Sequence, residues 1–162
     1  MASSDDYSEG PNVRSRIKAS PIPLWINLLL VFLILFMLPQ VYWNYFDHQV
    51  LLDSGITIQG EPDQNVLFTT AGRLVAMIAA SVLVLVTQNP AQYVVVMLMS
   101  AIREAQEGFI DPLYPMADAP ISPTVDFVIH ALIVAAEVAA LVVVYRLARQ
   151  QNAAPAPQLE GV

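Results

Sequence analysis

Residues 24–42 read LWINLLLVFLILFMLPQVY, and the part before Pro39 contains one strongly polar side chain, Asn27. A helix rises 1.5 Å per residue, so about 20 apolar residues match a hydrocarbon core of roughly 30 Å. Pro39 should kink or end such a helix near its far end. Aromatic side chains flank both ends, as expected at membrane interfaces: Trp25, Tyr42, Trp43 and Tyr45. This stretch therefore predicts a transmembrane helix.

The rest of the chain has the same character. Hydrophobic residues make up 56% and charged residues 13%, about half the charged share of soluble domains. Because lipid offers no hydrogen-bond partners, each long apolar block should be a helix. We predict an all-α membrane protein with four transmembrane helices in an antiparallel bundle, spanning residues 24–42, 66–87, 91–107 and 123–146. This transmembrane domain, residues 24–149, lies between two cytoplasmic tails predicted to be disordered, 1–23 and 150–162.

The basic residues indicate the orientation. Five of the seven flank the membrane at the two ends of the chain: Arg14, Arg16, Lys18, Arg146 and Arg149. The two long loops expected on the other side, residues 47–65 and 108–122, contain none. The positive-inside rule then places both termini in the cytoplasm, which requires an even number of spans. The alternative is three spans, with the second or third block re-entrant. We expect a multi-pass protein of a cell membrane, the bacterial inner membrane.

Several classes of function lack support in the sequence. The chain has no cysteine, which excludes disulfides, thiolate metal sites and cysteine nucleophiles. No basic patch predicts nucleic-acid binding, and the net charge is −7. No metal site is predicted. A haem held by two histidines would need a partner for His130, and His48 lies in a loop.

Ionisable side chains lie within the last three predicted spans, where each needs a partner or a role. They are Arg73, Arg103, Glu104, Glu107, Asp126, His130 and Glu137. Antiparallel threading places most of them at similar shallow depth toward the outside. Spacings of four put Arg103 with Glu107, and Asp126 with His130, on common faces. Glu137 follows His130 by seven residues and should lie about 10 Å deeper on the same face. The pattern predicts a polar pocket open to the outside, with Glu137 at its floor.

A purely structural interpretation remains open for the shallow residues. Arg103 can form an interfacial ion pair with Glu104 or Glu107. Asp126 suits the first turn of its helix, and His130 can be a neutral packing residue. Glu137 lies too deep for this account. We expect it to be protonated, or paired with Arg73, Arg103 or His130.

Residues 66–146 resemble the small DoxX-like four-helix membrane proteins. The resemblance is carried by AGRL at residues 71–74, by REAQE at 103–107, by a proline-rich loop that ends APISP at 119–123, and by Glu137. It implies a four-helix membrane fold. Founding members of that family are associated with quinol oxidation, so the resemblance implies a quinone as a candidate cofactor.

Three functions stay open. The first is an accessory or lipid- and quinone-interacting bundle that acts through membrane lipids, a homo-oligomer or a membrane-complex partner. The second is an intramembrane acid/base enzyme, such as an isomerase, cyclase or quinone-site subunit. In it Glu137 would carry the proton, His130 would relay it, and Arg73 or Arg103 would stabilise an anionic or carbonyl group. The third is a proton-coupled transporter that works as an oligomer.

Overall fold

The computed structural model describes residues 22–114, 118 and 121–153, so most of both predicted tails lies outside the described residues. Its helices are α1 (Leu24–Tyr45), α2 (Gln49–Asp53), α3 (Glu61–Thr87), α4 (Pro90–Leu113) and α5 (Pro123–Ala153). No strand occurs in the described part of the chain. The predicted all-α class is confirmed.

Three of these helices, α1, α3 and α5, are long and apolar enough to cross a membrane. They present many large apolar side chains outward, among them Leu28, Val86 and Leu132. Apolar surface of this extent is compatible with a membrane location. α4 has 24 residues but is less apolar than these three helices, because it carries Arg103, Glu104, Glu107 and Asp111.

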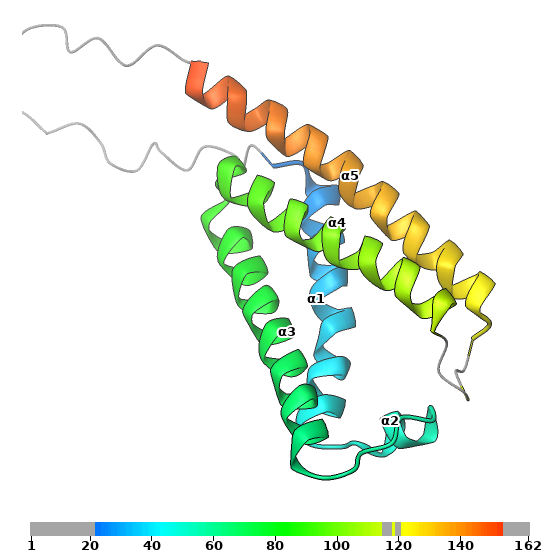
Figure 1. Cartoon of the computed structure of the whole chain (residues 1–162). Coiled ribbons are helices and arrows are strands. Elements are labelled where there is room, and N and C mark those ends of the chain that lie inside the picture. Colours follow the sequence, from blue (N-terminus) through cyan, green and yellow to red (C-terminus); the bar gives the residue numbers. More distant parts are fainter. Residues whose placement is uncertain (1–21, 115–117, 119–120, 154–162) are drawn as a thin grey trace, which may run out of the picture.

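The long helices form two closely packed pairs, α1 with α3 and α4 with α5 (Figure 1). α3 and α4 meet at a short turn and diverge from it, so they pack less extensively on each other. One apolar core joins the pairs. Its buried side chains include Ile26, Leu30, Leu33 and Met37 of α1, Leu74, Met77 and Val84 of α3, Tyr93, Val96 and Met97 of α4, and Ala140 and Val144 of α5.

The turn between α3 and α4 follows from its residues. Gln88 adopts a left-handed conformation (φ 51°) and ends α3. The Asn89 side chain then accepts a hydrogen bond from the backbone N–H of Ala91 at 3.0 Å, and Pro90 begins α4, where no N–H is needed. Tyr93 donates a hydrogen bond from its hydroxyl to Asn27 at 2.5 Å. Asn27, the strongly polar side chain of the first apolar stretch, therefore links α1 to the start of α4.

The two long predicted loops are shorter in the structure than expected. Residues 47–65 were expected to be loop, yet they contain α2, and α3 begins at Glu61. Pro62 in the first turn, with Glu61 and Asp63 as favourable acidic residues beside the helix N-terminus, explains the early start. Residues 108–122 were also expected to be loop, yet α4 continues to Leu113.

Two helices, α1 and α5, extend further than predicted. α1 passes through Pro39 and ends at Tyr45. α5 runs to Ala153, although residues from 150 onward were assigned to the disordered tail. Arg149 and the following glutamines are good helix formers, and the first proline after Pro123 is Pro155.

Candidate functional site

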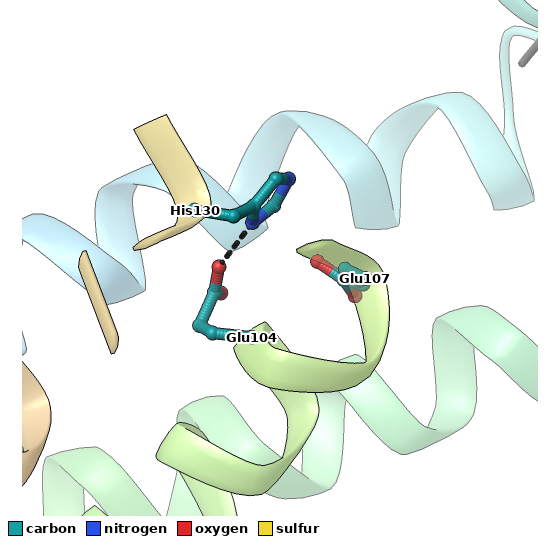
Figure 2. Close-up of side chains that lie close together, drawn as sticks. All are labelled: Glu104, Glu107 and His130. Carbon is teal, nitrogen blue, oxygen red and sulfur yellow. Dashed lines mark hydrogen bonds and ion pairs between the residues drawn. The ribbon is translucent and has the colours of Figure 1, made fainter. Parts of the chain in front are cut away.

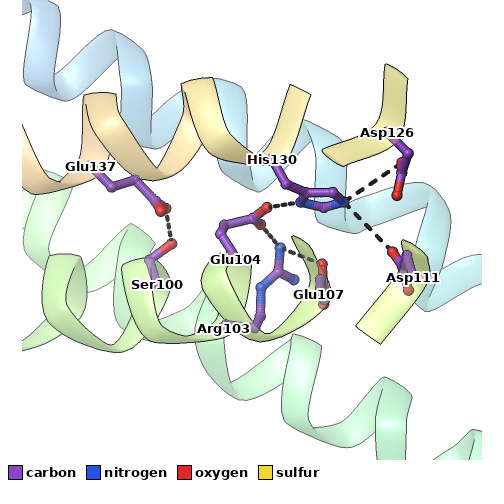
Figure 3. A network of polar contacts seen from close by, with 8 residues as sticks. All are labelled: Ser100, Arg103, Glu104, Glu107, Asp111, Asp126, His130 and Glu137. Atoms are coloured by element: carbon purple, nitrogen blue, oxygen red, sulfur yellow. Dashed lines mark hydrogen bonds and ion pairs between the residues drawn. The ribbon is translucent and has the colours of Figure 1, made fainter. Parts of the chain in front are cut away.

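Polar side chains line the contact between α4 and α5, which we call the α4–α5 seam (Figure 3). It comprises Ser100, Arg103, Glu104, Glu107 and Asp111 of α4 with Asp126, His130 and Glu137 of α5. Six of these had been predicted to belong to one pocket with Arg73: Arg103, Glu104, Glu107, Asp126, His130 and Glu137. The seam brings these six together, while Arg73 lies outside it.

Glu104 lies at the centre of the seam and is completely buried, at 0% exposure. Its Oε2 atom is 2.9 Å from Nδ1 of His130 (Figure 2). Its Oε1 atom forms an ion pair with Nη2 of Arg103. Two interactions from two helices therefore fix this carboxylate, which makes Glu104 the anchor of the arrangement.

His130 is 7% exposed and lies between carboxylates on both sides of its ring. On the side away from Glu104, its Nε2 atom is 3.7 Å from Oδ2 of Asp111 and 3.8 Å from Oδ1 of Asp126. The ring can come this close to α4 because residue 108 is glycine. A Cβ atom on Gly108 would lie 3.0 Å from Cβ of His130.

Arg103 is the only basic side chain in the seam besides His130. Its Nη2 atom also lies 3.6 Å from Oε2 of Glu107. Its Nε and Nη1 atoms are buried and have no hydrogen-bond partner among the described residues. One guanidinium therefore faces two carboxylates and retains N–H groups for a further acceptor, because guanidinium offers five donors.

Glu137 occupies a deeper position in the same seam and is fully buried. Its Oε1 atom accepts a hydrogen bond from the hydroxyl of Ser100 at 2.5 Å. Its Oε2 atom has no partner in the described part of the chain. None of the predicted pairings with Arg73, Arg103 or His130 is present. Ser100 was not among the predicted site residues, although it lies one helical turn before Glu104 on α4.

Arg73 is exposed on α3 and lines a different space, a cavity of about 570 Å³ between α3 and α4. Arg103, Gln106 and Glu107 line its polar part, and its other walls are mostly apolar, with Leu74, Met77, Ala80, Met99 and Ile102. We call it the α3–α4 cavity. The single predicted pocket is thus two neighbouring sites, and Arg103 and Glu107 belong to both.

The seam brings together two groups of side chains with metal-ligand chemistry. One is Glu104, Glu107 and His130 (Figure 2), and the other is Asp111, Asp126 and His130. Within each group the ligand atoms lie within 4.8 Å of one another. Asp111 was not among the predicted site residues because residues 108–122 were assigned to a loop. The spacing of four between Glu107 and Asp111 could have identified it as a member of the same helical face.

Comparisons of the chain with protein-family models, with curated proteins and with solved structures find no match.

Proposed function

We propose that this chain is a multi-pass membrane protein that binds an amphiphilic small molecule in the α3–α4 cavity. The observation that carries the proposal is the position of Arg103. It lines a mostly apolar cavity of about 570 Å³ and has buried N–H donors without a partner among the described residues. A carbonyl or anionic head group would satisfy these donors, and an apolar body would contact the remaining walls.

Arg73 supports the same ligand class. It lines the cavity from α3 and forms no ion pair within the described residues. Two arginines near one end of an apolar space suit a head group with more than one acceptor oxygen. A lipid-soluble quinone and an anionic lipid or fatty acid share this chemistry. The resemblance to the DoxX-like proteins favours the quinone.

We further propose four spans with both termini in the cytoplasm. At about 1.5 Å per residue, the 24 residues of α4 extend about 36 Å, enough to cross. Its charged side chains do not oppose this, because Arg103, Glu104 and Glu107 face the seam or the cavity. With the basic residues 14–18 before α1 and those at the end of α5 in the cytoplasm, α4 has to return the chain to the outside. The bacterial inner membrane remains our proposed location.

A second candidate function is acid/base catalysis on the bound molecule. It is favoured by the contact between Glu104 and His130, in which a carboxylate holds one ring nitrogen of a histidine. The proton carrier we expected, Glu137, pairs with Ser100 instead. His130 and Glu104 are therefore the better candidates for proton transfer, and Glu107 lies between them and the α3–α4 cavity.

Ligand binding can be measured on the full chain in nanodiscs, with a short-chain quinone and a fatty acid as separate probes. We expect Arg103→Gln to weaken binding about 10- to 100-fold, because a charge-assisted hydrogen bond contributes about 1.5–3 kcal/mol. Arg73→Gln should weaken it less, since Arg73 is exposed. Arg146→Gln, at the far end of α5, is the matched control.

The two probes separate the quinone from the anionic lipid as the preferred ligand. Equal affinity of Arg103→Gln and the control variant for both probes would overturn the proposal. Recovery of the ligand unchanged supports a binding role. Conversion of the ligand that His130→Ala abolishes would instead support the acid/base enzyme.

A further inference from the structure

We propose that Asp111, Asp126 and the Nε2 atom of His130 bind a divalent transition-metal ion at the end of the α4–α5 seam. None of these three residues lines the cavity of the proposed ligand, and the site stands independently of that function. No sequence motif predicted this site, because its ligands come from two helices. One ligand, Asp111, had also been assigned to a loop.

The geometry leaves space for an ion between the three side chains. Nε2 lies 3.7 Å from Oδ2 of Asp111 and 3.8 Å from Oδ1 of Asp126, too far for hydrogen bonds (Figure 3). Zinc binds nitrogen and oxygen at about 2.0–2.2 Å, which places neighbouring ligand atoms roughly 3–3.5 Å apart. The two distances from Nε2 therefore exceed that spacing by only a few tenths of an ångström, and all three ligand atoms lie within 4.8 Å of one another.

Glu104 supplies the second and independent observation. It accepts the hydrogen bond at Nδ1 of His130, at 2.9 Å, from a fully buried position. A neutral ring with its proton on Nδ1 directs the lone pair of Nε2 toward Asp111 and Asp126. Metal-binding histidines commonly have this arrangement, in which a carboxylate orients the ring through its other nitrogen.

The local charge also favours a cation at this point. Arg103 contacts Glu104 and Glu107, so its charge is directed to the other side of His130. Asp111 and Asp126 have no lysine or arginine partner among the described residues. In the tautomer with its proton on Nδ1, Nε2 faces two carboxylates and no donor when no ion is bound. A divalent cation satisfies all three groups at once.

The ligand types narrow the choice of metal. One imidazole nitrogen with two carboxylates suits zinc, manganese or ferrous iron, whereas magnesium and calcium prefer oxygen alone. Asp111 is 45% exposed on its side chain, so water can reach the ion and fill the remaining coordination positions. Three protein ligands with an open position are typical of catalytic zinc sites.

The other group, Glu104, Glu107 and His130, is a weaker candidate for the same ion. The guanidinium of Arg103 already contacts both glutamates and would repel a metal placed between them. Glu104 would also have to give up the contact that orients His130. We therefore assign Glu104 the role of a positioning residue.

The proposal can be tested by titrating Zn²⁺ and Co²⁺ into the full chain in nanodiscs after chelator treatment. Calorimetry gives the affinity and stoichiometry, and the visible spectrum of Co²⁺ reports on its ligands. We expect one ion per chain. Asp126→Asn and Asp111→Asn should each weaken binding at least about tenfold, and Glu104→Gln about 10- to 100-fold, as second-sphere changes do. Glu107→Gln and the distant Glu61→Gln are matched controls that should bind normally.

Three results would overturn the proposal. The first is zinc binding by Asp126→Asn and Asp111→Asn as tight as that of the unmodified chain. The second is loss of binding in Glu107→Gln with both aspartate variants unaffected, which would place the ion in the other group. The third is a nitrogen NMR spectrum that shows His130 doubly protonated and unchanged by zinc, since an imidazolium would then satisfy the aspartates alone.

Discussion

Two carboxylates buried in one seam have different environments. Glu104 contacts a guanidinium and an imidazole, whereas Glu137 contacts a hydroxyl. Both are fully buried, so burial alone does not distinguish them. Replacing Glu104 leaves the guanidinium of Arg103 with only its longer contact to Glu107, whereas replacing Glu137 removes no charged partner. The loss of a charge-assisted contact is larger than the loss of a neutral hydrogen bond. The two residues should therefore respond differently to the same substitution.

We expect Glu104→Gln to lower the free energy of unfolding by about 1.5–3 kcal/mol, because Arg103 loses one charge-assisted contact and keeps only the longer one to Glu107. Glu137→Gln should change it by less than about 1 kcal/mol, because an amide oxygen can still accept from Ser100. Unfolding of the detergent-solubilised chain, followed by the fluorescence of Trp25 and Trp43, measures both. Equal losses in the two variants would show that the contacts of Glu104 do not stabilise the fold.

The close packing of α4 on α5 is the feature on which the seam depends. At Gly108 the two helices approach so closely that an added Cβ would lie 3.0 Å from Cβ of His130. Small residues permit such close approach of helices in membranes. The separation of the helices at this point sets the distances from His130 to Glu104 and to the aspartates.

Gly108→Ala tests this dependence. The extra methyl group must push α4 away from His130, and overpacking of this kind typically costs about 1–3 kcal/mol. We expect a lower thermal midpoint and weaker Zn²⁺ binding, because the ligand atoms move apart. Gly72→Ala, on α3, is the control, because a Cβ added there would lie 3.6 Å from the hydroxyl oxygen of Tyr45, an ordinary contact distance. Unchanged stability and zinc affinity in Gly108→Ala would show that the approach is not needed.

At the scale of the whole molecule, the features predicted correctly from the sequence are those set by local pattern. Apolar length predicted where the long helices lie, and the spacing of four predicted that Asp126 and His130 share a face. Contacts between helices were not accessible in this way. The pairing of His130 with Glu104 depends on the packing at Gly108, and the pairing of Glu137 with Ser100 depends on the register of two helices. The division of one pocket into two depends on the divergence of α3 from α4.

The proposed four-span topology predicts which side of the membrane each connection between helices faces. The chain has no native cysteine, so single cysteines can be introduced without any other change. Exposed positions suit the labelling: Thr57 before α3, Ala91 at the start of α4, Ser122 before α5 and Ala153 at its end. We expect Thr57→Cys and Ser122→Cys to react with a membrane-impermeant maleimide in intact cells. Ala91→Cys and Ala153→Cys should react only after the membrane is permeabilised.

The position of Ala153 distinguishes this topology from the three-span alternatives. If α4 were re-entrant, Ser122 would stay on the cytoplasmic side and α5 would carry Ala153 outward. If α3 were re-entrant, Ala91 would be outside, α4 would cross inward, and Ala153 would again be outside. Labelling of Ala153→Cys in intact cells therefore contradicts four spans whichever helix fails to cross. Its protection, together with protection of Ala91→Cys and labelling of Ser122→Cys, requires that α4 crosses. A crossing α4 keeps its charged side chains away from lipid because they face α5 and the α3–α4 cavity.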